Sequence, residues 1–364
     1  MTISNKVRLL DSKGQPYSYV LQGLRGWSVP QQPVFNCNVY AAAHVVADPV
    51  AMQNPTRDMA IDWEATLEYR RHLMSLGFGV AEAMDTAQRG MGLDWPTSLA
   101  LIQRSVAQAK DFPQVTIASG AGTDHLSDFT GLTLQDVINA YEQQIAEIEA
   151  CGGRIILMAS RALAAIAKGP EDYIKVYDTI LRQVREPVIL HWLGDMFDPA
   201  LRGYWGTEAI HDAMDVSLSV IRNNAAKIDG IKISLLDKDR EISMRRQLPA
   251  SVKMYTGDDF NYPELIAGDS QGYSHALLGI LDAIAPAACG AVHALAQGDR
   301  QRYEQILAPT LPLARHIFSA PTQYYKSGIV FLAWLNGHQR HFTLLGGMQS
   351  AQPDALLRTV PPGR

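Results

Sequence analysis

The chain has 364 residues, of which 47% are hydrophobic and 19% charged, and its formal net charge is -5. This composition predicts a globular protein with a large core, and the lack of a basic excess argues against nucleic acid or an anionic membrane as a partner. The three cysteines are far apart, and the longest apolar runs are too short to cross a membrane. We therefore expect a cytoplasmic protein without a membrane partner.

The chain starts with an expected β-hairpin in residues 1–30, where runs 7–10 and 17–21 flank a turn at 13–16. Short β-branched runs then alternate with longer amphipathic segments, a pattern typical of βα units around a parallel sheet. Eight strands are expected, at 33–38, 79–83, 115–119, 154–158, 187–191, 229–233, 252–256 and 270–274. These strands predict an α/β protein with a (β/α)8 TIM barrel over residues 31–275.

Apolar residues at three- and four-residue spacing predict the helices that would cover this barrel. The clearest are expected at 62–76, 95–109, 133–150, 170–184, 207–226 and 238–247. After the eighth strand the pattern becomes helical throughout, with breaks at 298–299 and 319–321. Residues 276–364 are therefore predicted to form a C-terminal helical extension.

Lys232 lies in the apolar run 229–234 (DGIKIS), in the sixth expected strand. Apolar surroundings destabilise a charged amine, lower its pKa and so provide the neutral amine that attacks a carbonyl carbon. The run alone is also compatible with a lysine in a surface ion pair. His191 directly follows the apolar run 187–190 and is expected at the same mouth of the barrel, where active sites of this fold lie.

Several motifs resemble the dihydrodipicolinate synthase / N-acetylneuraminate lyase family. The pattern Gly230-Ile231-Lys232, followed by Thr256-Gly257-Asp258-Asp259, is similar to the sixth and seventh strands of that family. Segments 61–67, 115–120, 268–274, 296–299 and 321–326 resemble other parts of it, so the resemblance covers roughly residues 60–340. It implies a barrel that forms a Schiff base on Lys232.

Two positions depart from the family pattern. Its second strand normally ends in Gly-Thr-Thr-Gly-Glu, which holds the carboxylate of pyruvate, whereas residues 83–88 here read AMDTAQ. Asp85 would repel a carboxylate, so a neutral, hydroxylated or sugar-derived carbonyl compound is the expected substrate. The family's proton-relaying tyrosine on the fifth strand aligns with His191, which can move protons at neutral pH.

The sequence therefore predicts a Schiff-base lyase or aldolase that needs no cofactor and acts on a small molecule. Lys232 and His191 are the expected catalytic residues. The expected substrate-binding residues are Asp85, Thr86, Asp124, Arg161, Ser234, Tyr255 and Asp258. The resemblance also implies a homodimer or homotetramer.

Two other functions remain open on the sequence alone. A sugar isomerase or epimerase could hold a divalent metal between Glu82, Asp124, His191 and Asp258, which are suitable ligands on separate strand ends. A barrel that binds a sugar without turning it over is the other, since a fold does not fix a function. For Asp258, capping of the following helix is an alternative to a role in the site.

Overall fold

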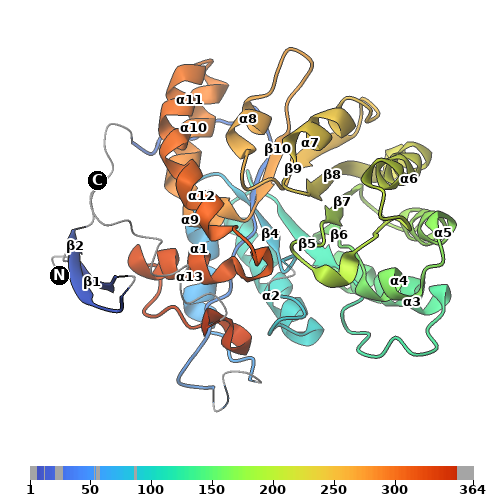
Figure 1. The fold of residues 1–364 in the computed structure, drawn as a ribbon, viewed down its shortest axis with the longest axis horizontal. Helices are drawn as coiled ribbons and strands as arrows, with labels where there is room; N and C mark the ends of the chain where they lie inside the picture. The colour runs from blue at the N-terminus through green and yellow to red at the C-terminus, as the bar shows by residue number, and fades with distance from the viewer. Residues whose placement is uncertain are drawn as a thin grey trace.

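A closed barrel of eight parallel strands forms the centre of the molecule in the computed structural model, which describes residues 6–11, 13–20, 28–52, 54, 58–85 and 88–350 (Figure 1). The strands are β3 (Val39–Ala41), β4 (Gly79–Glu82), β5 (Ile117–Ala121), β6 (Arg154–Leu157), β7 (Val188–Leu193), β8 (Ile228–Ser234), β9 (Lys253–Thr256) and β10 (His275–Leu278). They are neighbours in chain order, and β10 closes the barrel by pairing with β3. The predicted (β/α)8 TIM barrel is confirmed.

Helices surround the barrel and connect successive strands. They are α1 (Trp63–Ser75), α2 (Trp95–Gln108), α3 (Leu134–Ala150), α4 (Arg161–Ile166), α5 (Pro170–Leu181), α6 (Ile210–Asn223), α7 (Lys238–Arg245) and α8 (Tyr262–Ala267). Side chains that accept hydrogen bonds from the first turn fix where several of them begin. Asp62, Asp94 and Asp237 cap α1, α2 and α7, and Thr133 with Asp136 forms a capping box on α3.

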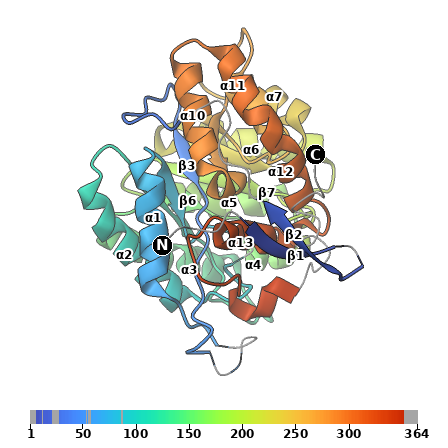
Figure 2. The same cartoon turned by 90° about the vertical axis from the view of Figure 1, so that its left-hand side faces the viewer.

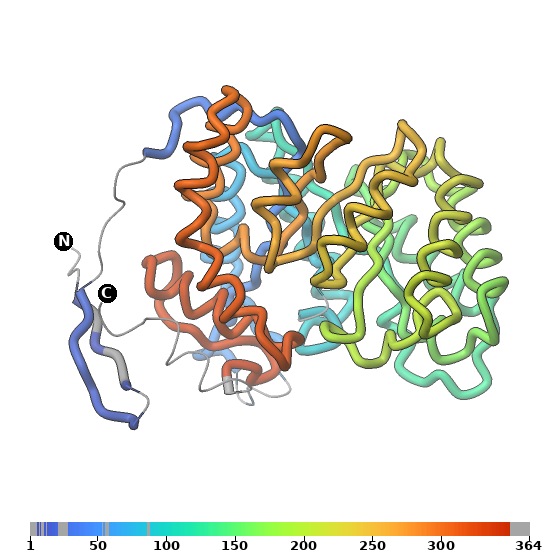
Figure 3. Tube along the Cα trace, turned by 45° about the horizontal axis from the view of Figure 1, so that its top comes forward, coloured from blue at the N-terminus to red at the C-terminus, as the bar shows by residue number. Residues whose placement is uncertain are grey.

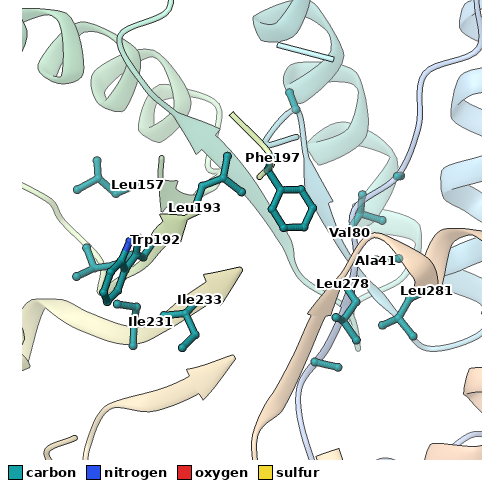
Figure 4. Packing of buried hydrophobic residues seen from close by; sticks show 14 of the residues in the cluster. Ala41, Val80, Leu157, Trp192, Leu193, Phe197, Ile231, Ile233, Leu278 and Leu281 are labelled. Atoms are coloured by element: carbon teal, nitrogen blue, oxygen red, sulfur yellow. The ribbon is translucent and has the colours of Figure 1, made fainter. Parts of the chain in front are cut away.

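The strands present alternate side chains to the helices and to the barrel interior. Apolar residues on the helix side include Val80, Trp192, Ile231 and Leu278 (Figure 4). A second cluster fills the interior, made of Tyr40, Ala42, Ala81, Met84, Ala118, Ile156, Met158, Ile189, Tyr255 and Leu277. Gly230 is needed beside this cluster, because a Cβ there would lie 2.6 Å from the Tyr255 ring.

The predicted N-terminal hairpin is confirmed as β1 (Lys6–Leu10) paired antiparallel with β2 (Pro16–Val20). Figure 3 shows it to the side of the barrel, beyond the C-terminal helices.

In the part of the chain that the structure describes, five α-helices follow β10. They are α9 (Ile280–Ala283), α10 (Ala285–Ala296), α11 (Arg300–Leu307), α12 (Leu311–Ile317) and α13 (Lys326–Leu335). Figure 2 looks onto this C-terminal extension, with α10 to α13 gathered on one side of the molecule. Both predicted breaks fall between helices, at 298–299 and at 319–321.

The predicted first and last barrel strands were wrong in position. The first strand is Val39–Ala41 and not 33–38. The expected segment contains Pro33, Asn36 and Asn38 and bends at 36–37, whereas 39–43 is apolar and buried. The last strand is His275–Leu278, and its residues 276–278 lie in the segment expected to be helical. Residues 268–274 instead form a turn, in which Asp269 Oδ1 accepts a hydrogen bond from Gln271 N.

Across the ranges described above, none of the helices has the length and apolar character needed to span a bilayer.

Candidate active site

Lys232 points into the barrel from β8. Its neighbours Ile231 and Ile233 face the helices, so the alternation of the strand turns Gly230, Lys232 and Ser234 inward. The side chain runs along Gly257, just after β9, where a Cβ would lie 2.8 Å from Lys232 Cε. Only 7% of the residue is exposed, and its amine has no hydrogen bond or ion pair with any residue that the structure describes.

Burial lowers the pKa of Lys232 to about 8, although the nearby carboxylates of Asp259 and Asp85 act in the opposite direction. The charge of Lys326 lowers it further. Asp259, which is also buried, accepts a hydrogen bond from Ile280 N at the start of α9. Burial raises the pKa of Asp259 to about 7, so this carboxyl and the Lys232 amine can both exchange protons near neutral pH.

His191 lies beside Lys232 on the adjacent strand, since the two residues pair in register between β7 and β8. Its Nε2 is 3.4 Å from Ser234 Oγ, and its Nδ1 is buried without a hydrogen-bond partner among the described residues. Burial and the charge of Lys232 hold the pKa of His191 well below its usual range. The imidazole is therefore neutral, with one nitrogen free to take part in proton transfer.

Asp85 follows β4 in a turn whose backbone is fixed by Arg89. The Arg89 guanidinium donates to Ala83 O and to Gly120 O, and the backbone of Ala83 has a positive φ of 46°. This conformation is strained for a residue with a side chain, and it places Asp85 over the barrel. There Asp85 Oδ2 accepts a hydrogen bond from the Tyr325 hydroxyl and lies 2.9 Å from Lys326 Nζ.

Asp124 and Arg161 line a cavity of about 270 Å³ at the ends of β5 and β6. Asp124 is paired with Arg89, and Arg161 Nε lies 2.6 Å from Asp198 Oδ2. The cavity also reaches Met158, a member of the interior cluster of the barrel. A larger cavity of about 660 Å³ lies between the loops after β7 and β8.

Three predicted residues lie elsewhere. Tyr255 accepts a hydrogen bond from Asn38 Nδ2 and donates to Asp229 Oδ2, so its hydroxyl points toward the N-terminal end of β8 and away from the mouth. Asp258 accepts from Phe260 N and Asn261 N in the turn before α8, which favours the capping alternative. Glu82 lies between the sheet and the helices.

The structure does not bring the four alternative metal ligands together, because Glu82 is bound by Arg70 from α1 and by Ser105 from α2. No group of three or more His, Cys, Asp or Glu side chains is placed to hold a metal ion within the ranges that the structure describes. Thr86 lies outside the described residues.

Sequence reasoning missed Asp259, Tyr325 and Lys326 as members of the site. Asp259 had a usable signal, because Tyr255 and Gly257 face inward and the alternation continues to position 259 rather than 258. Tyr325 and Lys326 had none, since their contacts with Asp85 join residues about 240 positions apart.

Gly257→Ala is expected to displace Lys232. Its Cβ would lie 2.2 Å from Ser234 Oγ and 2.6 Å from the Ile233 carbonyl oxygen, so the backbone as well as Lys232 must move. We expect a lower melting temperature and at least tenfold slower reductive trapping of a carbonyl compound on the Lys232 amine, since small displacements of reacting groups are costly. Gly169→Ala is the control, because the nearest atom there, Glu171 Oε2, lies 3.9 Å away. Equal rates in the two variants would contradict this close packing.

The barrel and its helical extension have the fold of the dihydrodipicolinate synthases. The 4-hydroxy-tetrahydrodipicolinate synthase from Methylacidiphilum fumariolicum SolV superposes with a TM-score of 0.64 at 16% identity, over 89% of this chain and 94% of the other. Dihydrodipicolinate synthase from Oceanobacillus iheyensis gives 0.63 at 12% identity, over 89% and 95% of the two chains. The fold expected from the resemblance is therefore confirmed.

At these identities the similarity extends to the fold alone. No curated protein matches the sequence. A family model does match residues 7–360, and the chain belongs to that family, which is described as "Protein of unknown function (DUF993)".

Proposed function

We propose that this protein is a carbon–carbon lyase or aldolase that forms a Schiff base between Lys232 and a small carbonyl substrate. The observation that carries the proposal is the state of the Lys232 amine, which is buried in the barrel yet bonded to none of the described residues. Burial without a partner favours the neutral amine, which is the nucleophile that imine formation requires.

The residues around Lys232 suit the proton transfers of this reaction. The amine attacks the carbonyl carbon, a C–N bond forms, and the carbonyl oxygen takes up a proton to give a carbinolamine. Loss of water then leaves an iminium ion. When the bond between the α and β carbons breaks, its electron pair forms an enamine and the β-hydroxyl loses its proton to become a carbonyl. Protonation of the enamine and hydrolysis of the imine then release the second product and free Lys232. His191 is neutral and Asp259 has a pKa of about 7, so these two groups can carry the protons between nitrogen and oxygen.

A hydroxylated or sugar-derived substrate fits the polar groups near the mouth. Asp124 and Arg161 line the 270 Å³ cavity, where a carboxylate can accept and a guanidinium can donate hydrogen bonds to hydroxyl groups. We assign the substrate-binding role to this pair and to Ser234. Tyr255 and Asp258 are assigned structural roles because of their internal hydrogen bonds. Asp85 is not assigned to substrate, since Tyr325 and Lys326 bind it and it does not line this cavity.

Reductive trapping tests the proposal directly. The protein is incubated with cyanoborohydride and, separately, with dihydroxyacetone, glyceraldehyde and pyruvate, and the adducts are located by peptide mass spectrometry. We expect a single dominant adduct on Lys232, with the hydroxylated compounds more reactive than pyruvate. Labelling spread over surface lysines, or none on Lys232 with any carbonyl compound, would reject Schiff-base chemistry at this site.

The rate of trapping on Lys232 should depend on pH with a midpoint near 8. Only the neutral amine attacks, so the rate rises as the pH passes upward through the pKa of about 8 and levels off above it. At pH 7 about a tenth of the amine is then neutral, whereas an amine with the ordinary pKa of 10.5 would be almost entirely charged. A rate that still rises steeply at pH 10 would contradict the effect of burial.

We also propose that the protein works as a homodimer or homotetramer in the cytoplasm. Sedimentation velocity at micromolar concentration measures the first of these expectations, and a monomer would reject it.

A further inference from the structure

A second lysine is buried at the barrel mouth, and it comes from the C-terminal extension. Lys326 begins α13, at the red end of the chain in Figure 1, and it is 1% exposed. Its Nζ donates to Ala42 O at 2.7 Å and lies 2.9 Å from Asp85 Oδ2 and 3.5 Å from Asp282 Oδ2. These acceptors follow β3, β4 and β10, so Lys326 ties α13 to three strand ends.

Asp85 is shared by two groups of the extension. Besides Lys326, the Tyr325 hydroxyl donates to the same oxygen of Asp85. The Tyr325 ring stacks on Phe318 with 4.4 Å between ring centroids and meets Phe197, from the loop after β7, edge-on at 6.1 Å. A Cβ on Gly279, at the end of β10, would touch both Tyr325 and Phe318. The aromatic rings thus hold this pair of residues over the mouth.

The two buried lysines differ in their bonding, although they lie close enough to interact electrostatically. Lys326 has three oxygen acceptors, whereas Lys232 has no partner among the described residues. Asp85 is near both, because its charge acts on Lys232 as well. A carboxylate that paired with Lys232 would stabilise its ammonium form, which cannot attack a carbonyl carbon.

We propose that Lys326 is a positioning residue for the reaction at Lys232, because it holds the Asp85 carboxylate and so prevents an ion pair between Asp85 and Lys232. This inference rests on the proposed Schiff-base function. It gives the C-terminal extension a direct part in the active site, and it explains why Asp85 can lie over the barrel without stabilising the unreactive ammonium form of Lys232. The fixed charge of Lys326 acts in the same direction, since a neighbouring cation disfavours a second one.

Other charged groups face this arrangement and remain in place when Lys326 is changed. Asp259 and His191 face Lys232 from the loop after β9 and from β7. Asp282 faces Lys326 from α9, and its carboxylate also pairs with His44 at 3.0 Å. Because these groups are constant between variants, a change in the pH dependence comes from Asp85 or from the lost charge of Lys326. Only an effect of Asp85 is reversed in the double variant.

The test compares the pH dependence of trapping at Lys232 in four proteins. Dihydroxyacetone and cyanoborohydride are used from pH 6 to pH 10, and labelling of the Lys232 peptide is followed with time. The proteins are the native chain, Lys326→Met, the double variant Lys326→Met/Asp85→Asn, and Lys227→Met. Lys227 is the control because, among the described residues, its amine donates a hydrogen bond to Val184 O alone, away from the mouth.

In Lys326→Met, Asp85 loses its neighbouring cation while the neutral Tyr325 donor stays, so its carboxylate should pair with Lys232. The midpoint should then rise by at least about one pH unit, and the rate at pH 7 should fall about tenfold or more. The double variant removes the carboxylate and should return the midpoint close to the native value. An unchanged midpoint in Lys326→Met, or a double variant that stays shifted, would overturn the inference. Should Lys326→Met alone not fold, a native midpoint in the double variant supports the inference and a raised midpoint rejects it.

This outcome is distinguishable from failure of the proposed function. If native Lys232 is not labelled at any pH, the Schiff-base function fails and with it the inference. If Lys232 is labelled in all four proteins with the same midpoint, the function stands and only the role of Lys326 is rejected.

Discussion

Replacement of Lys232 by methionine is expected to abolish adduct formation and to reduce turnover of the substrate by about 10³-fold or more, since loss of a covalent nucleophile removes the whole catalytic path. The fold should remain intact, because the Lys232 amine makes no hydrogen bond to the described residues that the change could break. Methionine keeps the side chain as far as Cε, the atom that lies along Gly257, and removes an amine whose charged form is poorly solvated. We therefore expect an unchanged or slightly higher melting temperature.

Two measurements check this result together, namely mass spectrometry of the trapped protein and thermal unfolding followed by circular dichroism. Lys227→Met should retain the native trapping rate, which would show that the loss of trapping is specific to Lys232. Lys232→Arg should be as inactive as Lys232→Met, because a guanidinium stays protonated. A Lys232→Met protein that still forms the adduct at another lysine, with turnover intact, would move the chemistry away from β8.

Disruption of the buried pair between Arg70 and Glu82 should have the largest effect on stability. Arg70 Nε and Nη2 each lie 2.8 Å from an oxygen of Glu82, and both side chains are fully buried. Arg70 Nη1 also donates to His44 O, which joins α1 to the segment after β3. Arg70→Met leaves an unpaired carboxylate in the core, and we expect a loss of about 3–5 kcal/mol in the free energy of unfolding.

Chemical denaturation measures this loss, and Arg71→Met is the matched control on the same helix. Arg71 pairs with Asp111 at the surface, where an ion pair contributes at most about 1 kcal/mol. The double variant Arg70→Met/Glu82→Leu should recover part of the stability, because no lone charge remains. Glu82→Gln decides the role of Glu82 itself. A lower free energy of unfolding would support the ion pair with Arg70. Native stability, together with activity that depends on an added divalent cation, would instead support Glu82 as a metal ligand.

Periodicity predicted the architecture because each element carries its own signal. The helices at 95–108 and 134–150 match the expected ranges within one residue, since their apolar stripes and capping residues are local. The first and last barrel strands could not be placed in this way. Strands of three and four residues that are buried on both faces show no alternation, and the turn at 268–274 resembled a strand of small residues.

Within the site, the same distinction holds between local and distant contacts. The inward direction of Lys232 follows from its apolar neighbours at 231 and 233, which the helices bury. The placement of Asp85 does not follow from its neighbours. The sequence suggested an open carboxylate that would bind substrate, but the partners of Asp85 lie on α13 and are distant in the chain.

The sequence by itself determined the barrel, the hairpin, the helical extension and the strand that carries Lys232, because alternation, helical spacing and caps depend on neighbouring residues. Only the tertiary structure decided which polar groups meet. Closure of the barrel brings His191 beside Lys232, buries Glu82 against Arg70, and seats Tyr325 and Lys326 on Asp85. Such contacts join residues far apart in the chain, and the energy of a buried charge depends on the partner it finds there, which no local pattern encodes.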